Sequence, residues 1–112
     1  MDCVFCKIIN GEIPSQVVYE DDLIVAIHDI QPKAPVHFLV IPKNHISSCA
    51  EITEQNSAIV AHIYEVIAKL ACELKLDNGY RVVTNVGKDG AQTVKHLHFH
   101  VMAGRQLSGE MG

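Results

Sequence analysis

The segment that most constrains the fold is residues 96–102, His-Leu-His-Phe-His-Val-Met, in which polar and apolar residues alternate strictly. A period of two predicts a half-buried β-strand, because successive side chains of a strand point to opposite faces of the sheet. The apolar members are then expected in a core, and His96, His98 and His100 in a row on the opposite face. Strand formation does not require histidine at these positions, so the row indicates chemistry on that face.

Two kinds of chemistry fit such a row. Neighbouring histidines lie about 6–7 Å apart along a strand and could converge on one metal ion, but the first and third lie roughly 13 Å apart. A single ion held by all three is therefore disfavoured. Imidazole, whose unperturbed pKa is about 6.5, also suits nucleophilic and acid-base catalysis near neutral pH. An exposed polar face without a function is the remaining alternative, and the row alone does not select the reaction.

The size and charge of the chain exclude several classes of protein. Its 112 residues are expected to form one domain, residues 1–112, with a sizeable core. A net charge of −4 without a cluster of lysine or arginine argues against a nucleic-acid duplex as partner. No apolar run approaches the roughly 20 residues of a membrane span, and no signal-peptide pattern opens the sequence. We therefore expect a cytoplasmic protein that does not bind a membrane.

Apolar spacing and turn residues predict a mixed arrangement of strands and helices. The predicted elements are a short helix over 3–9, strands over 16–20, 23–27 and 36–41, a long helix over 54–76, and strands over 80–85 and 96–102. Thr53 is the expected N-cap of the long helix, whose apolar stripe would cover the sheet. A line of small residues on this helix, Ala61, Ala68 and Cys72, either permits close approach by a second copy or only reflects good helix propensity.

Cys3 and Cys6 form a Cys-x-x-Cys pair within the first predicted helix. A thioredoxin-type pair should follow a strand, and no strand precedes this one. Half of a Cys2His2 zinc site, which needs two histidines from elsewhere, is one interpretation, and free thiols are the other. The four cysteines of the chain are unevenly placed, which favours thiols or metal ligands in a reducing compartment over disulfides.

Asp29 and His37 each allow a structural and a functional interpretation. Asp29 follows the apolar strand 23–27, where a carboxylate either satisfies backbone N–H groups of a turn or accepts the two hydroxyls of a ribose. His37 lies within the apolar run 36–41, where a histidine is usually a satisfied core residue. The histidine row on another strand makes a catalytic role for His37 worth considering.

A loop with two glycines, Gly87 and Gly90, leads directly into the histidine strand. Such a loop can turn successive N–H groups toward one point and bind an anion, with Asn85 and Thr93 adding side-chain donors. An ordinary hairpin loop is the alternative. Anion donors next to a nucleophilic imidazole favour phosphoryl transfer over acyl transfer.

Residues 96–102 resemble the motif of the histidine triad family, His-φ-His-φ-His-φ-φ, where φ is apolar. Further segments resemble the branch of that family known as HINT, which hydrolyses nucleoside phosphoramidates: 5–9, 12–14, 20–22, 28–30, 34–35, 40–42 and 104–106, together with His37. The resemblance covers nearly the whole chain. It implies an α+β fold with five antiparallel strands and one long helix, and a homodimer in which two sheets join into one.

The same resemblance implies an enzyme that hydrolyses the P–N bond of purine nucleoside 5′-phosphoramidates and releases the nucleoside monophosphate. His98 resembles the nucleophile that becomes nucleotidylated, His100 the member that contacts phosphate, and His96 the member that orients the nucleophile. His37 matches a buried histidine behind them. No cofactor is needed for this chemistry.

The resemblance also assigns residues to each part of the substrate. The phosphate positions are Asn85, Ala91 through its backbone N–H, Gln92 and Thr93, and Asp29 matches the carboxylate that binds the ribose. The expected walls of the purine pocket are Val4, Phe5, Ile8, Ile27, Ile30 and Leu39. Two positions depart from the pattern: Thr93 replaces the more frequent serine, and Ala91 replaces a glycine where the backbone should approach phosphate closely.

Some members of the family carry a structural zinc ion, and the matching residues here are Cys3, Cys6, His45 and His96, a Cys2His2 set. Two other functions remain open at this stage. One is hydrolysis of dinucleoside polyphosphates by the same nucleophile, and the other is a zinc-containing nucleotide-binding or sensor module without relevant turnover. The choice between adenosine and guanosine, and the physiological leaving group, are not encoded in these motifs.

Overall fold

The computed structural model describes residues 3–112. The elements in order are α1 (Val4–Ile9), β1 (Val17–Glu20), β2 (Ile24–His28), β3 (Val36–Pro42), the 3-10 turn η1 (Cys49–Glu51), α2 (Ala58–Glu73), β4 (Arg81–Val83) and β5 (Phe99–Ala103). The five strands form one sheet in the order β1-β2-β3-β5-β4, and every neighbouring pair is antiparallel. The predicted α+β class with two helices is confirmed.

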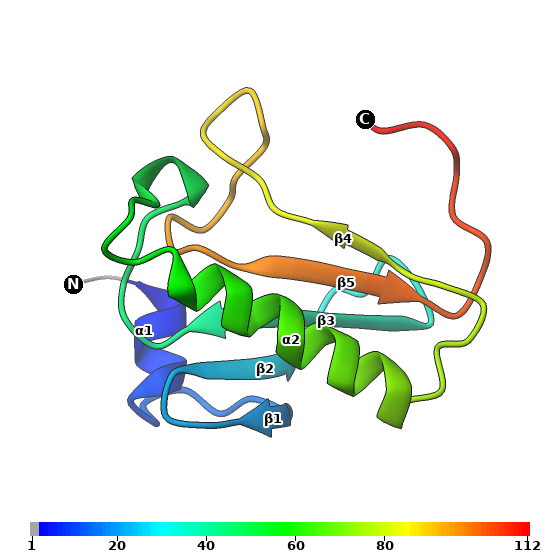
Figure 1. Ribbon diagram of the computed structural model, residues 1–112, viewed down its shortest axis with the longest axis horizontal. Helices are drawn as coiled ribbons and strands as arrows, with labels where there is room; N and C mark the ends of the chain where they lie inside the picture. Colours follow the sequence, from blue (N-terminus) through cyan, green and yellow to red (C-terminus); the bar gives the residue numbers. More distant parts are fainter. Residues whose placement is uncertain (1–2) are drawn as a thin grey trace.

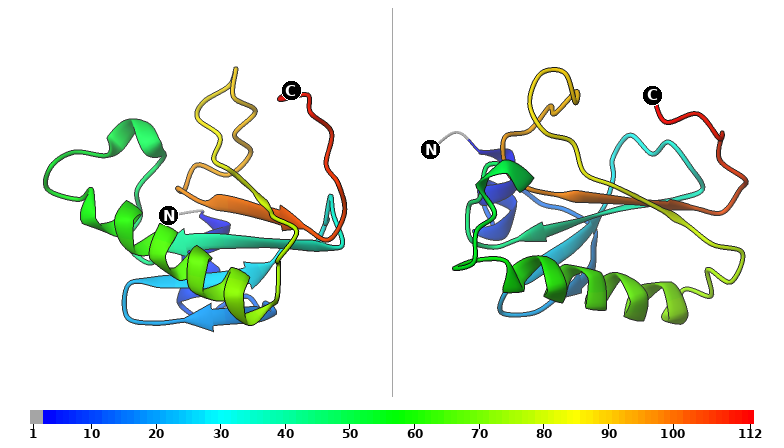
Figure 2. Two further views of the ribbon diagram at one scale, coloured as in Figure 1. Left: turned by 45° about the vertical axis from the view of Figure 1, so that its right-hand side comes forward. Right: turned by 45° about the horizontal axis from the view of Figure 1, so that its top comes forward.

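The two faces of the sheet are covered differently (Figure 1, Figure 2). The long helix α2 crosses one face and packs through Ile63, Val66, Ile67 and Leu70 against strand residues such as Phe38 and Val101. The short helix α1 lies on the opposite face, where Phe5 packs with Leu39 and Ile41. Alternate residues of β3 therefore enter two separate cores, which explains why its apolar run is continuous.

The long helix is shorter than predicted at both ends. Thr53 does not begin it: its hydroxyl accepts from Gln55 N (3.2 Å) and its carbonyl from Ser57 N (2.9 Å), so residues 54–57 form a turn and α2 begins at Ala58. At the other end Lys75 has a φ of 57°, the left-handed conformation of a helix C-terminus. Leu74 continues the apolar stripe of the helix in the sequence, but the helix ends at Glu73 and Leu74 is its C-cap.

The strand predicted over 96–102 begins only at Phe99, and the one over 80–85 spans Arg81–Val83. Leu97 N donates to Ile46 O at 2.6 Å, a bond to the segment after β3 instead of to a neighbouring strand. The alternation still places the apolar members correctly, since Leu97, Phe99 and Val101 are all buried in the core under α2. The histidines do not all share one face, as described below.

The remaining predicted elements differ from the observed ones by no more than one residue at either end. None of the helices formed by residues 3–112 is long and apolar enough to cross a membrane.

Candidate active site

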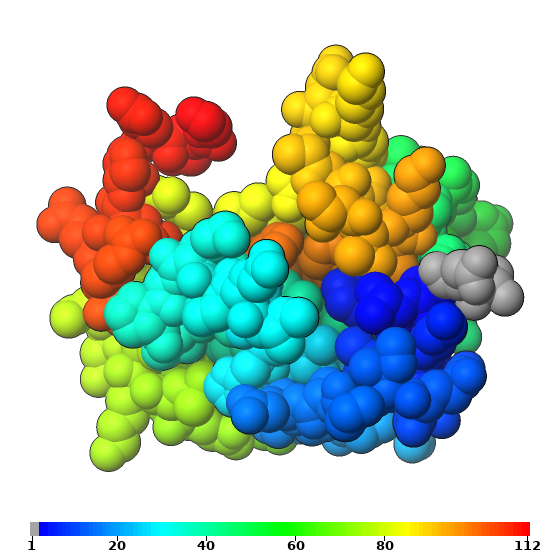
Figure 3. All heavy atoms as spheres, turned by 180° about the vertical axis from the view of Figure 1, so that it is seen from behind, coloured from blue at the N-terminus to red at the C-terminus, as the bar shows by residue number. Residues whose placement is uncertain are grey.

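A cavity of about 1160 Å³ opens on the sheet face that carries α1. From behind, the molecule is hollowed between the blue N-terminal helix, the cyan segment after β2 and the yellow-orange loop before β5 (Figure 3). Twelve of the residues predicted for catalysis or substrate binding line it: Phe5, Ile8, Ile27, Asp29, Ile30, His37, Leu39, Asn85, Ala91, Thr93, His98 and His100. Val4 lines it as well. The tertiary structure thus brings together residues from both ends of the chain.

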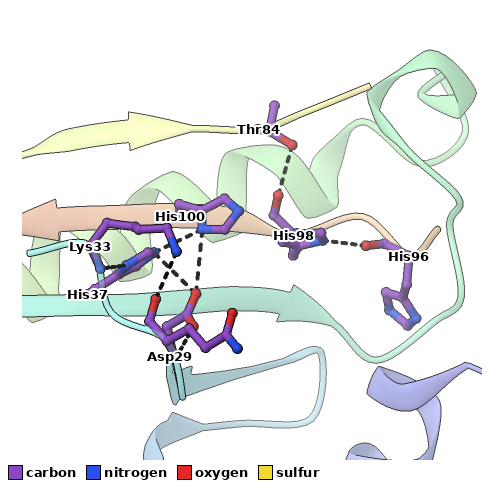
Figure 4. A network of polar contacts seen from close by, with 8 residues as sticks. Asp29, Lys33, His37, Thr84, His96, His98 and His100 are labelled. Carbon is purple, nitrogen blue, oxygen red and sulfur yellow. Dashed lines mark hydrogen bonds and ion pairs between the residues drawn. The ribbon is translucent and has the colours of Figure 1, made fainter. Parts of the chain in front are cut away.

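His98 is held with one ring nitrogen directed at the cavity. Its Nδ1 lies 2.7 Å from the carbonyl oxygen of His96, and a carbonyl only accepts, so Nδ1 carries the proton and donates (Figure 4). Nε2 then keeps its lone pair. The Thr84 hydroxyl donates to the carbonyl of His98 at 2.8 Å and ties this residue to the segment after β4. Burial lowers the pKa of His98, and the residue is only 5% exposed, so a neutral imidazole faces the cavity.

His100 ends a chain of hydrogen bonds that begins at the backbone. Lys33 N donates to His37 Nδ1 at 2.9 Å, so His37 carries its proton on Nε2 (Figure 4). That Nε2 lies 2.9 Å from His100 Nδ1 and donates to it, which leaves the proton of His100 on Nε2. Burial and then the neighbouring His98 and His37 lower the pKa of His100 to about 4. His100 therefore offers a fixed neutral donor beside the lone pair of His98.

Asp29 makes the turn contact that its position in the sequence allowed, and its second oxygen lies beside the histidines of the cavity. Its Oδ1 accepts from Gln31 N at 2.8 Å, as a turn carboxylate does. Its Oδ2 lies 3.4 Å from His37 Nε2 and 3.9 Å from His100 Nδ1, on the cavity side. One oxygen shapes the backbone, and the other places a negative charge against the histidine pair.

The loop before β5 contributes to the cavity, but two of the groups predicted to hold phosphate make hydrogen bonds within the protein instead. Gln92 does not line the cavity; its amide donates to Ser47 O (2.7 Å) and Val94 O (3.0 Å) and its oxygen accepts from Gly87 N. Gln92 therefore shapes the loop instead of holding phosphate. Ala91 lines the cavity, but its N–H donates to Lys88 O at 3.0 Å and so is not free for a phosphate. Asn85, which donates to Gly90 O, and Thr93 remain beside the cavity.

His96 leaves the histidine row. It is fully buried, does not line the cavity, and packs behind the site with its ring turned away from His98 and His100 (Figure 4). Its Nε2 lies 2.8 Å from the carbonyl oxygen of Pro42 and must donate to it, so the lone pair is on Nδ1. The carbonyl of His96, and not its ring, positions His98. The expectation of three imidazoles on one face is wrong, because the chain reaches the sheet only at Phe99.

The ring of His96 belongs to a second cluster with Cys3, Cys6 and His45. Its Nδ1 lies 3.2 Å from Cys3 Sγ and 3.6 Å from Cys6 Sγ, and His45 Nδ1 lies 3.3 Å from Cys6 Sγ. All four ligand atoms are within 4.8 Å of one another. Tetrahedral zinc with bonds of about 2.0–2.3 Å separates its ligands by about 3.6 Å. These residues fit a zinc ion, and the Pro42 carbonyl is the partner that a metal-binding histidine usually has on its other nitrogen.

Comparison with known proteins agrees with this geometry. A family model described as scavenger mRNA decapping enzyme C-term binding matches residues 2–112. An uncharacterized HIT-like protein of Synechococcus elongatus is 46% identical over 111 residues, which cover 99% of this chain and 97% of the relative. The chain belongs to the histidine triad family. Two solved structures have the same fold. The histidine triad protein from Clostridium difficile is 52% identical, with a TM-score of 0.95, and the match covers 99% of this chain and 97% of that one. The HIT family hydrolase from Legionella pneumophila is 45% identical, with a TM-score of 0.96, and the match covers 99% of this chain and 100% of that one.

The histidine triad fold also brings residues to the cavity that the sequence analysis did not select. Lys33, Val83 and Met102 line it. Val83 is the register partner of His100 across the β4–β5 pair, a relation that only strand pairing reveals. Lys33 could have been suspected, because it stands four residues after Asp29 and four before His37.

Proposed function

We propose that this histidine triad protein hydrolyses the P–N bond of purine nucleoside 5′-phosphoramidates through a covalent intermediate on His98. The observation that carries the proposal is the lone pair of His98 Nε2, which faces the cavity because Nδ1 is bound to the carbonyl of His96. A neutral, fixed imidazole is the form that attacks phosphorus.

The reaction runs in two steps with one water consumed. His98 Nε2 forms a bond to the α-phosphorus as the P–N bond breaks and the amine leaves with a proton. Water then attacks phosphorus, the P–Nε2 bond breaks, and the proton lost by water balances the one taken by the amine. The products are the nucleoside monophosphate, the free amine and the regenerated imidazole. The Nε2–H of His100 and the amide of Asn85 would donate to phosphoryl oxygens as charge collects on them.

The remaining cavity residues suit a purine nucleoside. Ile30 is 95% exposed although it lines the cavity, and a bound base would cover this large apolar side chain together with Phe5 and Ile8. Asp29 Oδ2 is an ionised acceptor for the hydroxyls of a ribose.

The test compares turnover of adenosine and guanosine 5′-phosphoramidates by wild type and His98→Asn. We expect the variant to retain nucleoside monophosphate binding and to lose turnover by several orders of magnitude, since no other group can form the covalent bond. His62→Asn is the matched control, because His62 lies on α2 across the sheet from the cavity and contacts Asp21. Equal turnover by wild type and His98→Asn would refute the mechanism.

A second candidate uses the same nucleophile on a phosphate leaving group. The description of the matching family model names an mRNA decapping enzyme, and a cavity of about 1160 Å³ has room for more than one nucleotide. Dinucleoside polyphosphates and a capped dinucleotide, tested beside the phosphoramidates, separate the two candidates by their kcat/KM. If nucleotides bind and none of these substrates turns over, the protein is a nucleotide-binding module.

We also propose that Cys3, Cys6, His45 and His96 hold a structural zinc ion, which would connect α1 to the carbonyl that positions His98. Zinc would act on the fold and not on the substrate, since its ligands lie behind the cavity. Metal analysis of protein purified without chelator should give one zinc per chain, and Cys6→Ser should lose it. Well under one zinc per wild-type chain would refute the proposal.

The homodimer implied by the resemblance is proposed to form at β4, the edge strand next to β5. Pairing of two β4 edges would join two sheets into one. The small residues Ala61, Ala68 and Cys72 lie on the exposed side of α2 and leave room for a second helix. Sedimentation that shows a monomer at micromolar concentration would refute the dimer. None of the four cysteines forms a disulfide, which supports a cytoplasmic enzyme.

A further inference from the structure

Lys33 places a positive charge at the cavity, and no carboxylate among residues 3–112 pairs with it. Of residues 3–112, it is the only lysine or arginine that lines the cavity. It takes part in none of the ion pairs formed by the described residues, and the one hydrogen bond of its ammonium is a long contact of 3.4 Å with Gln31 O. Lysine ammonium groups are strongly hydrated and flexible, so this one is available to an anion entering the cavity.

The backbone of Lys33 is held at two points, which directs its side chain. Its N–H donates to His37 Nδ1 (2.9 Å) and its carbonyl accepts from Arg105 Nη2 (3.0 Å). The side chain extends from this anchored backbone over the His37 ring, with its ammonium on the side of His100 and Asp29 (Figure 4). Burial is the main cause of the lowered pKa of His37 and of His100, and the charge of Lys33 adds a smaller effect in the same direction.

The charge balance of the cavity shows why this cation matters. Hydrogen bonds leave one proton on each of the His37 and His100 rings, and burial lowers the pKa of both, so these two rings carry no charge at neutral pH. The carboxylate of Asp29 lies 3.4 Å from His37 Nε2, and its negative charge repels a phosphate. Hydrogen bonds from neutral imidazoles are weaker than those from an ionised donor.

We infer that the ammonium of Lys33 binds a non-bridging oxygen of the substrate phosphate beside His100. This inference rests on the proposed function, because it places the phosphate of a nucleotide at the histidines. Lys33 is then a phosphate-binding residue that neither the triad motif nor the glycine loop supplies. Lys33 would strengthen binding of the monophosphate more than binding of the nucleoside, since only the monophosphate brings an anion to this end of the cavity.

The experiment measures by calorimetry the binding of AMP and GMP, each against its own nucleoside, to wild type, Lys33→Met and Lys33→Arg. We expect Lys33→Met to weaken binding of the monophosphate about five- to tenfold and to change nucleoside binding by less than about twofold. Lys33→Arg should restore most of the affinity. Lys69→Met is the matched control, because Lys69 is exposed on α2 across the sheet and its loss changes the net charge equally.

Two results overturn the inference while the proposed function stands. One is monophosphate binding by Lys33→Met that equals wild type and Lys69→Met, and the other is equal weakening of monophosphate and nucleoside, which would mean that Lys33 only shapes the pocket. If wild type binds neither monophosphate, the proposed function fails and the inference fails with it. Thermal midpoints of all variants, measured in parallel, check that each is folded.

Discussion

Acidification from pH 7 to pH 5 is expected to destabilise the fold through His100. In the unfolded chain its pKa is about 6.5, and in the fold burial and the adjacent His98 and His37 lower the pKa to about 4. The unfolded chain therefore binds the proton more tightly, so stability falls as the pH drops below about 6.5. With these two values, proton linkage through His100 alone removes about 2 kcal/mol of unfolding free energy at pH 5.

The assay is urea unfolding of wild type and His100→Asn at pH 7, 6 and 5, each protein being compared with itself at pH 7. Wild type should lose about 2 kcal/mol more than the variant between pH 7 and pH 5, because both keep the other buried histidines and the cysteine–histidine cluster. An NMR titration of the His100 ring supplies an independent reading. Equal losses in the two proteins, or a ring that titrates near 6.5, would refute the argument that the site holds His100 neutral.

Other predictions concern the backbone and the far side of the sheet. Ala91 has a φ of 59°, so Ala91→Gly should stabilise the fold by about 1 kcal/mol, measured by urea unfolding; a lower stability would contradict the strain. Gly104 has a φ of 97°, and an added Cβ would lie 2.8 Å from the Cβ of Pro35, so Gly104→Ala should cost about 2 kcal/mol and lower the thermal midpoint. Asp21 accepts from two backbone N–H groups of the β1–β2 turn, a tyrosine hydroxyl and an imidazole of α2. Asp21→Ala should therefore lose about 2–3 kcal/mol by the same measurement, and a loss below about 0.5 would refute a role in joining helix and hairpin.

Much of the fold follows from local patterns in the chain. The apolar run over 36–41 and the stripe of α2 predict a buried strand and a covering helix, and both are present within a few residues. The ends of α2 were missed because they depend on backbone geometry: the turn organised by Thr53 and the left-handed Lys75. Propensity alone does not distinguish a first helical turn from an isolated turn that precedes it.

At the site, too, the histidine motif predicts some features correctly and misses one that depends on the tertiary structure. The alternation of residues 96–102 correctly predicts which of them enter the core and that His98 and His100 reach the cavity. It wrongly adds His96 to the row, because period two holds for a residue's ring only while the backbone is extended and paired. The bond from Leu97 N to Ile46 O turns this segment out of the sheet, and that bond depends on a segment about 50 residues away.

What the sequence determined by itself is the set of elements, the apolar residues of the histidine segment that enter the core, and the identity of the chemical groups, because these depend on side-chain type and on spacing along the chain. What only the tertiary structure decided is the proton position and the orientation of each of these groups. The Lys33 amide sets the proton positions on His37 and His100, the Pro42 carbonyl turns the lone pair of His96 toward the cysteines, and Lys33 itself comes to the cavity. A hydrogen bond between distant segments chooses which nitrogen of an imidazole is reactive, and no local pattern encodes that choice.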